Sequence, residues 1–529
     1  MNAPLALALL LAQGAEPSMA TVTAIQPGGQ LHVQDALLAD VDRDGRADLV
    51  LAMGGEGTRE LRVHLRSDGP TPFGNRADLS VPLTGDVVAW AVADVHADPG
   101  AEVVLLTAEA AFVWRPRAEE ARERFAPLLE APFLWQLPER DRAFAWQECV
   151  VDLDGDGLDD LLLPVPGGWR LALQRRGEDG AARFVTAGEP RAPQEPSSFL
   201  TAFSSEGRAG GVQGEATDRE LSFSLSVGVD EEGVRPSGPL LSVRESTPAP
   251  QLGDWDADGD LDLLAQGTTE LWVWTQDAEH RFATEPAVKL ALPVVRDRTR
   301  LLDVSYSAHT LDLDRDRRAD CLIFAGDKRS EDVRTQLLVF TQKAGGAGPP
   351  LFGDKGLPAQ LLVFAGFAGY PDFRDVDGDG LEDLVVSSLR PDLIDMVRSA
   401  SSQSLSIEYY VYLNRGGRFS KSPDLIHERT VPIDSSKVDS TFLGDLTGDG
   451  LSEVLLRDRH EVLRVLLTRR KGQQLILFER PLWELGIDAK ADLRVVRGSG
   501  QPGKPGAPRK TGPELLVLEP RQVLHVSFP

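Results

Sequence analysis

Apolar and polar residues alternate in blocks along this chain, and each apolar block has the length of a β-strand. Runs such as residues 87–92, 103–106 and 161–163 are separated by short polar stretches. Continuous apolar runs of this length fit strands that are buried on both faces. Because the pattern recurs from about residue 20 to the C-terminus, it predicts an all-β fold built from repeated sheets.

An acidic segment of nine residues stands between the first two apolar runs of each repeat. Its clearest copy has Asp152, Asp154, Asp156, Gly157 and Asp160 in the pattern D-x-D-x-D-G-x-x-D. Alternating carboxylates can converge on one point where the chain curls, and a glycine permits the sharp turn. Four like charges this close repel one another unless a cation lies among them. Oxygen ligands in a flexible loop suit Ca²⁺ better than Mg²⁺, which demands tighter octahedral geometry.

Six further copies argue against an accidental acidic turn. Three of them are intact: Asp40, Asp42, Asp44 and Asp48; Asp254, Asp256, Asp258 and Asp262; and Asp375, Asp377, Asp379 and Asp383. Two are altered: Asp312, Asp314, Asp316 and Asp320, where Arg317 replaces the glycine, and Asp445, Thr447, Asp449 and Glu453. The seventh consists of Asp94, His96, Asp98 and Glu102, and imidazole is a poor ligand for Ca²⁺.

The net charge of -26 comes from these loops. Of the 82 acidic residues, 26 occupy loop ligand positions, and the remaining 56 equal the 56 Lys and Arg residues. The rest of the chain is therefore balanced in charge. There is no basic patch with interleaved aromatic residues, so the sequence does not predict nucleic-acid binding.

A third apolar strand follows the second in each repeat, and then a polar turn and a phenylalanine. We expect these phenylalanines to open a fourth strand and to anchor the core: Phe73, Phe125, Phe184, Phe282, Phe352, Phe419 and Phe478. Four strands per unit, at about the period of propeller blades, predict a β-propeller. EF-hands are excluded, because strands flank the loops and no Glu stands at a twelfth position.

These repeats resemble the FG-GAP/VCBS repeat family, the calcium-loop propellers that include the head of integrin alpha chains. The resemblance covers nearly the whole chain from about residue 20, and the turn at residues 414–419 also resembles the family's turn. It implies that each loop between the first and second strands holds Ca²⁺ through side chains at positions one, three, five and nine and a carbonyl at position seven. It applies in full to the four intact loops, whereas Arg317, Thr447 and His96 depart from the pattern.

An eighth unit without an acidic loop ends the chain. Residues 493–496, 515–518 and 523–526 resemble its first three strands, and a stretch rich in Gly, Pro and Lys replaces the loop. We predict that residues 21–25 supply the missing strand and close the ring, which removes two open sheet edges. The predicted propeller has eight blades, or seven if the last unit packs outside the ring.

Two insertions interrupt this single predicted domain of residues 20–529, at about residues 190–250 and 388–406. Alternating residues 221–227, together with 240–243, predict a projecting hairpin in the first, and residues 391–404 predict a short helix in the second. Strand parity places both on the face opposite the acidic loops. Elaborated loops on a rigid scaffold often carry function, so we expect a ligand there; idle surface decoration is the alternative.

Residues 1–19 form a possible signal peptide or leader, and we expect an extracellular or periplasmic protein. The apolar run at residues 3–12 is too short to span a membrane, and no Lys or Arg precedes it. An alternative start is Met19. Cys149 and Cys321 flank loops of different repeats, and we expect them to be buried and unpaired.

No catalytic motif is present: the chain contains neither G-x-S-x-G nor H-E-x-x-H. The leading hypothesis is a calcium-binding propeller that binds a protein or a glycan, rather than an enzyme. Two alternatives remain: a lyase-like enzyme acting on polysaccharides, and a purely structural module. Six tryptophans offer either aromatic platforms or core packing: Trp90, Trp114, Trp146, Trp169, Trp272 and Trp274.

Overall fold

The structure is a computed structural model, and its described residues form strands and loops without a helix. It describes residues 19–55, 57–69, 71–95, 100–115, 124–133, 145–146, 149–177, 182–193, 219–230, 233–245, 250–267, 270–291, 304–327, 334–342, 357–365, 367–368, 371–389, 404–432, 440–458, 461–472, 474–496 and 512–528. In this part of the chain no helix is long and apolar enough to cross a membrane.

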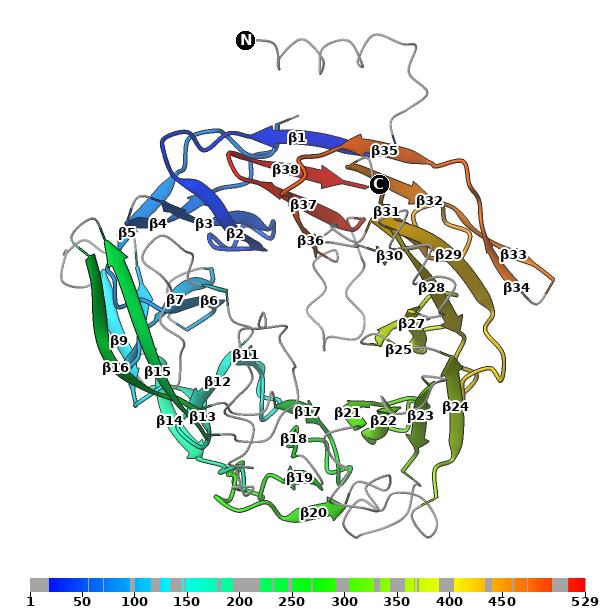
Figure 1. Cartoon of the computed structure of the whole chain (residues 1–529), viewed down its shortest axis with the longest axis horizontal. Coiled ribbons are helices and arrows are strands. Elements are labelled where there is room, and N and C mark those ends of the chain that lie inside the picture. The colour runs from blue at the N-terminus through cyan, green and yellow to red at the C-terminus, as the bar shows by residue number, and fades with distance from the viewer. Residues whose placement is uncertain are drawn as a thin grey trace.

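Eight antiparallel sheets stand side by side in a ring, as the blades of one β-propeller (Figure 1). We name them blades A to H in chain order, beginning with the sheet that contains residue 32. The prediction of an all-β propeller with eight blades is confirmed, and the seven-bladed alternative is wrong because the last unit lies within the ring.

Blades A to D comprise the first half of the ring. Their strands are, for A, β2 (His32–Ala39), β3 (Asp48–Gly55), β4 (Thr58–His64) and β5 (Leu79–Leu83); for B, β6 (Ala89–Ala93), β7 (Glu102–Leu106), β8 (Ala110–Trp114), β9 (Phe125–Glu130) and the short β10 (Ala145–Trp146), which pairs in parallel with β6; for C, β11 (Val150–Val151), β12 (Asp160–Val165), β13 (Gly168–Arg176) and β14 (Ala182–Gly188); and for D, β17 (Gln251–Gly253), β18 (Asp262–Gln266), β19 (Glu270–Trp274) and β20 (Val288–Ala291).

Blades E to H complete it. Their strands are, for E, β21 (Val304–Leu311), β22 (Asp320–Asp327), β23 (Arg334–Phe340) and β24 (Gln360–Ala365); for F, β25 (Phe367–Ala368), β26 (Asp372–Arg374), β27 (Asp383–Leu389), β28 (Ser404–Tyr412) and β29 (Leu425–Pro432); for G, β30 (Ser440–Gly444), β31 (Glu453–Arg457), β32 (Val462–Leu466) and β35 (Trp483–Gly486); and for H, β36 (Asp492–Val496), β37 (Glu514–Glu519), β38 (Gln522–Ser527) and β1 (Thr21–Ile25).

The ring closes by pairing the first strand of the chain with the last. β1 runs antiparallel to β38, with Thr21 opposite Ser527 and Ile25 opposite Val523, and Figure 1 shows the two strands side by side. The predicted closure by residues 21–25 is therefore confirmed. The pairing covers the edge that β38 would otherwise expose, and β1 becomes the outer strand of blade H.

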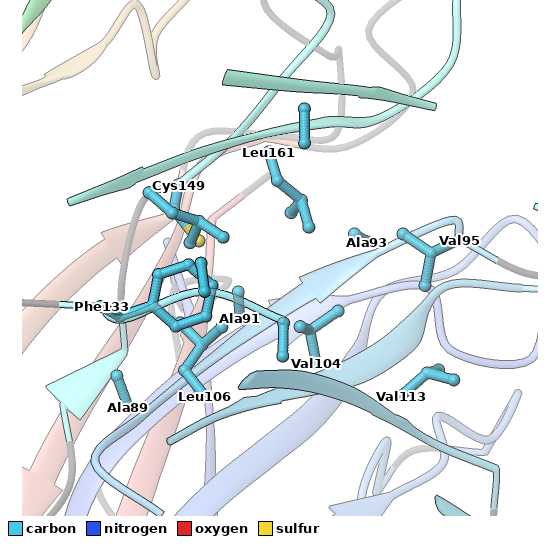
Figure 2. Packing of buried hydrophobic residues seen from close by; sticks show 14 of the residues in the cluster. Ala89, Ala91, Ala93, Val95, Val104, Leu106, Val113, Phe133, Cys149 and Leu161 are labelled. Carbon is cyan, nitrogen blue, oxygen red and sulfur yellow. The ribbon is translucent and has the colours of Figure 1, made fainter. Parts of the chain in front are cut away.

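The hydrophobic core is divided among the blade interfaces. Eight clusters of buried side chains each lie between two neighbouring blades. Cys149, for example, packs with Ala91 and Leu106 of blade B and Leu161 of blade C (Figure 2). Because a central strand such as β3 or β37 faces a neighbour on both sides, every one of its residues is buried. This explains why the sequence shows continuous apolar runs.

Both cysteines are buried and unpaired, as predicted. Burial raises the pKa of the Cys149 thiol to about 12 and raises that of Cys321 as well. These thiols are consequently protonated packing groups.

The phenylalanine prediction is only partly right. Phe73, Phe282 and Phe419 are buried, but they lie in the turn before the fourth strand rather than in the strand. Phe125 opens β9 and Phe478 precedes β35, yet they are 44% and 45% exposed, so the prediction that they anchor the core is wrong. Phe184 lies within β14 and is partly buried, and Phe352 lies outside the described residues.

Two hairpins extend the basic blade plan. β15 (Arg219–Asp230) pairs with β16 (Gly233–Glu245) between blades C and D, where residues 221–227 predict a hairpin. β33 (Thr468–Lys471) pairs with β34 (Gln474–Leu477) between the third and fourth strands of blade G, where the sequence predicts only a turn. The possible leader and the predicted helix at residues 391–404 fall almost entirely outside the described residues.

Candidate metal centres

The seven acidic loops occupy one equivalent place, between the first and second strands of blades A to G. Six of them share a pattern of internal hydrogen bonds, which we number by loop position one to nine. The carboxylate at position one accepts the N–H of position six at 2.8 to 3.1 Å. The carboxylate at position five accepts the N–H of position seven at 2.8 to 3.0 Å. These bonds curl the loop around its own acidic side chains.

Two positions in each of these loops adopt the left-handed conformation. At position six, four intact loops and the Asp445 loop use glycine, with φ between 83° and 101°. Arg317 holds this place in blade E with φ 70°, and its N–H still bonds to Asp312. The departure at Arg317 therefore leaves the loop shape intact. Position four is also left-handed, and there Arg43, Ala257 and Arg315 take φ values of 60°, 62° and 61°.

The carboxylate at position nine fastens the loop to its blade. It is at most 1% exposed in six loops, at Asp48, Asp160, Asp262, Asp320, Asp383 and Glu453. One of its oxygens accepts the N–H of the apolar residue at position two, at 2.7 to 3.0 Å. In five loops the other oxygen accepts an N–H at the end of the third strand, at 2.7 to 3.0 Å. These hydrogen bonds hold the backbone of the apolar residue at position two against the blade.

Burial disfavours the ionised form of these position-nine carboxylates. It raises the pKa of Asp160, Asp262, Asp320 and Asp383 to about 7, and that of Glu453 also to about 7. The neighbouring loop carboxylates add to this effect, since like charges disfavour ionisation. A cation held among the same oxygens would reverse both effects.

Five of the predicted loops gather three carboxylates each. Oxygen atoms that lie within 4.8 Å of one another come from Asp40, Asp42 and Asp48; Asp152, Asp154 and Asp160; Asp254, Asp256 and Asp262; Asp312, Asp314 and Asp316; and Asp375, Asp377 and Asp383. In the four intact loops the position-five carboxylate is not part of this group, nor is Asp320 in blade E. Loops with such groups could hold a metal ion, and their all-oxygen chemistry fits a hard cation.

Several buried oxygens of these loops have no hydrogen-bond partner. Among the described residues these are Asp94 Oδ1, Asp152 Oδ1, Asp377 Oδ1, Glu382 Oε2 and Glu453 Oε1. Glu453 is fully buried, and its other oxygen bonds to Leu446 N–H at 2.7 Å. Leaving a buried acceptor without a partner costs about 1–3 kcal/mol, and more when it is charged. A bound cation would satisfy these oxygens, so the residues present fit one.

Two of the predicted centres are less complete. Asp445, Thr447, Asp449 and Glu453 keep the loop shape, but they bring no three carboxylates together in the described structure. In the seventh loop, His96 and Asp98 lie outside the described residues. Its ends keep part of the pattern, since Glu102 accepts the N–H of Val95 at 3.1 Å.

Ion pairs between arginines and the acidic loops are not predicted from the sequence. Arg175, at the end of β13, contacts Asp154 at 2.6 Å and Asp156 at 3.1 Å. On the β33–β34 hairpin, Arg469 pairs with Asp449, and Arg470 reaches Asp377 of blade F at 3.0 Å. The only sequence signal is a basic residue close to the end of a third strand. Such a cation partly offsets the charge of the carboxylates.

A cavity of about 100 Å³ lies between blades F and G. Its apolar wall includes Val411, Leu425 and Phe442, and polar side chains of Tyr409 and His427 also line it. In the described part of the chain neither polar side chain bonds to another residue, and burial lowers the pKa of His427. Ser387 and Ser440, which also line it, lie toward the strand ends remote from the acidic loops. Val454, which directly follows the loop residue Glu453, and Val411 near the end of β28 also line it, so the cavity runs along the interface of the two blades rather than on one face.

Five of the six tryptophans considered for a platform are core residues, and the side chain of the sixth, Trp146, lies outside the described part of the structure. Trp90, Trp114, Trp169, Trp272 and Trp274 are all at most 3% exposed, so the packing interpretation is confirmed for these five. Trp169 and Trp274 meet edge to face across the interface of blades C and D, with ring centroids 5.5 Å apart. An aromatic sugar platform between blades therefore cannot be built from them.

No protein-family model matches this sequence, and no curated protein is recognisably similar to it. Among solved structures, the chain is similar to the exotype rhamnogalacturonan lyase YesX at 12% identity, with a TM-score of 0.35 over 96% of this chain and 76% of that one. It is also similar to BBS1N from a complex with ARL6DN, at 7% identity and a TM-score of 0.34 over 97% and 98% of the two chains. A third is the WD40 domain of SCAP from fission yeast, at 10% identity and a TM-score of 0.27 over 97% of both chains. Similarities this low carry no inference about ligand or activity.

Proposed function

We propose that this protein is a calcium-binding β-propeller of the FG-GAP/VCBS type that presents the face opposite its acidic loops to a protein or glycan ligand. The observation that carries the proposal is the convergence of loop carboxylates together with buried loop oxygens that lack partners. Calcium suits this donor set, which is all oxygen and held by a flexible loop. We place the protein in an extracellular or periplasmic setting, where calcium modules typically have dissociation constants of about 0.1–1 mM.

In this proposal the intact loops hold calcium through their acidic side chains, for example Asp152, Asp154, Asp156 and Asp160 in blade C. The bound ion supplies positive charge, which offsets the mutual repulsion of the carboxylates. At about 2 mM calcium and a dissociation constant of about 0.1 mM, one site adds roughly 1.8 kcal/mol of stability. The role of the metal is therefore to stiffen one face of the ring.

Calorimetry with calcium, magnesium and chelator tests the metal part of the proposal. We expect calcium to raise the melting temperature markedly in metal-free buffer and magnesium to raise it little. Titration calorimetry should give at least four calcium ions per chain. A melting curve that calcium leaves unchanged would contradict calcium binding.

The cavity between blades F and G favours a ligand-binding role over a purely structural one. Pockets with an apolar wall and a few unpartnered polar groups are typical of ligand sites. A glycan array together with capture of soluble protein partners tests the ligand, and an assay for uronate release tests the lyase alternative. Tyr409→Phe should weaken a ligand held in this cavity, whereas Tyr410→Phe, on the other face of β28, should not.

A further inference from the structure

Hydrogen bonds join the acidic loops of neighbouring blades. At three junctions the residue at position eight of one loop donates its backbone N–H to a carbonyl at position one or two of the loop in the preceding blade. These bonds run from Ala101 to Asp40 at 3.0 Å, from Ala319 to Asp254 at 2.8 Å and from Ser452 to Val376 at 2.8 Å. They link blades A and B, D and E, and F and G.

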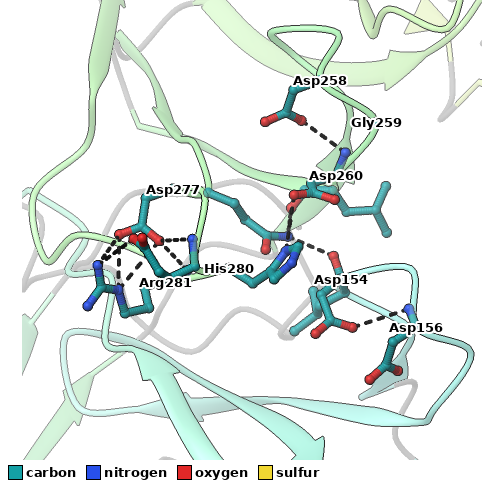
Figure 3. A network of polar contacts seen from close by, with 12 residues as sticks. Asp154, Asp156, Asp258, Gly259, Asp260, Asp277, His280 and Arg281 are labelled. Carbon is teal, nitrogen blue, oxygen red and sulfur yellow. Dashed lines mark hydrogen bonds and ion pairs between the residues drawn. The ribbon is translucent and has the colours of Figure 1, made fainter.

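Side chains make the other three links. Gln276 of blade D donates from Nε2 to the Leu153 carbonyl of blade C at 2.7 Å, and Asn414 of blade F donates from Nδ2 to the Leu313 carbonyl of blade E at 2.8 Å. Between blades B and C, the N–H of Asp94 donates to Asp159 Oδ2 at 2.7 Å. Figure 3 shows the loop of blade C, with Asp154 and Asp156, beside that of blade D, with Asp258 and Asp260. All seven loops thus belong to one hydrogen-bonded arc.

The loops also approach too closely for an extra atom at two junctions. A Cβ added to Gly100 of blade B would lie 2.1 Å from the Val41 carbonyl oxygen of blade A. One added to Gly378 of blade F would lie 2.7 Å from the Gly450 carbonyl oxygen of blade G. Movement of one loop must therefore be accommodated by its neighbour.

We infer that the loops take up their cations cooperatively, each loaded loop raising the affinity of the loops beside it. This inference rests on the proposed calcium binding. The fully buried Glu453 Oε1, which has no hydrogen-bond partner, is independent support for a bound cation. The linking carbonyls belong to positions one and two, next to the side chains that would hold the ion. A cation that fixes these positions in one loop also fixes the acceptor that holds the next loop. Two sites coupled in this way share one free energy of interaction, which acts in both directions.

The arc predicts which loops are coupled most. Loops in the middle, such as those of blades C, D and E, have a loop neighbour on each side. Blade H has no acidic loop in the sequence, so the loops of blades A and G each have only one. Cooperative uptake should accordingly be strongest in the middle of the arc.

Hydrogen exchange, followed peptide by peptide during a calcium titration, tests the coupling in the full chain. The readout is the calcium concentration that half-protects a peptide covering residues 254–262, the loop of blade D. Asp154→Asn weakens the site of blade C without changing its size. We expect this variant to raise the half-protection concentration of the blade D loop about five-fold or more.

Two glutamines provide matched backgrounds. Gln276→Leu removes the link between blades C and D, and in this background Asp154→Asn should no longer shift the loop of blade D. Gln342 has the equivalent place in blade E, but its side chain bonds within its own blade, to the Ala319 carbonyl at 2.7 Å. In the Gln342→Leu background the shift should persist.

The outcomes separate the coupling from the metal site itself. If calcium protects the loops but Asp154→Asn leaves the loop of blade D unchanged, the sites are independent and the coupling is wrong. The same conclusion follows if Gln276→Leu and Gln342→Leu behave alike. If no loop gains protection at any calcium concentration, calcium binding fails, and the coupling fails with it.

Discussion

Arg66 of blade A and Glu514 of blade H form an ion pair across the seam where the ring closes. The guanidinium donates to both carboxylate oxygens, with Nη1 3.2 Å from Oε2. Glu514 also lies 3.3 Å from His525 Nε2, and the His525 ring meets Phe73 edge to face. Arg66 donates its backbone N–H to Asp48 as well, so the seam contact and the first acidic loop share a residue.

This seam predicts an acid-sensitive component of stability. Burial by itself would raise the pKa of Glu514, but the neighbouring His525 and the hydrogen-bonded Arg66 outweigh it and lower the pKa to about 2. A depressed carboxyl pKa stabilises the fold above the unfolded value of about 4.5, and the effect is lost as the pH falls toward 2. We expect Glu514→Gln to cost about 3 kcal/mol at pH 6, and less than half of that at pH 3. Urea unfolding of both proteins across this range measures the difference.

A pH-independent difference would mean that Glu514 acts through packing rather than charge. Glu60→Gln is a control, because its ion pair with Arg62 lies within blade A and does not cross the seam. For Glu60→Gln we expect a small effect, since ion pairs that remain in contact with solvent contribute about 1 kcal/mol or less.

The first strand, β1, should stabilise the fold because it closes the ring. Ile25 is fully buried and packs with Leu516 and Val523 of blade H. We expect Ile25→Ala to cost about 2–5 kcal/mol, as is usual for a buried isoleucine. Val22 on the same strand is 41% exposed, and Val22→Ala should cost well under 1 kcal/mol. Equal effects in denaturant unfolding would show that closure by β1 contributes little.

Strained loop positions predict stabilising substitutions. Ala257 and Arg317 adopt left-handed φ values of 62° and 70°, which cost a residue with a Cβ about 1–2 kcal/mol. Glycine removes this strain but loses more entropy on folding, so Ala257→Gly and Arg317→Gly should each stabilise by about 0.5–1 kcal/mol. Gly157→Ala, at φ 83°, should destabilise instead. Melting temperatures measured in chelator separate these backbone effects from metal binding. If both glycine variants were less stable than the original protein, backbone strain at these positions would be contradicted.

The sequence predicts the scaffold better than the details of its loops. The ring follows from apolar run lengths and from a nine-residue spacing, because both depend only on neighbouring residues. The sequence does not predict the left-handed turn at position four. Glycine, which favours this conformation, stands there as Gly155 and Gly378, but other loops have Arg43 or Ala257 at the same position. The β33–β34 hairpin was missed because residues 468–474 are mostly polar and resemble a turn. Contacts between blades, such as Arg470 with Asp377, depend on the way the blades pack, which local patterns do not contain.

Loop chemistry distinguishes Asp154 from Thr447, although both stand at position three. Asp154 belongs to a group of three converging carboxylates, whereas the loop of Thr447 forms no such group among the described residues. With calcium at about 2 mM, Asp154→Ala should lose most of the roughly 1.8 kcal/mol that one site adds, and Thr447→Ala less. In chelator this difference should disappear. Scanning calorimetry with and without calcium gives the comparison, and a difference that persists in chelator would assign it to packing.

Arg175 should act as an internal competitor of the cation in blade C. Its guanidinium lies 2.6 Å from Asp154 and 3.1 Å from Asp156, where it opposes a second positive charge. It is partly exposed, so its influence is moderated by solvent and falls with added salt. We expect Arg175→Gln to strengthen calcium binding in this loop by about two- to five-fold at low salt, and by less at high salt. Arg170→Gln is the matched control, because Arg170 lies on the same strand but pairs with Glu189. Hydrogen exchange of residues 152–160 during a calcium titration resolves this site. Weaker binding in Arg175→Gln would mean that the arginine positions the two carboxylates for the ion rather than competing with it.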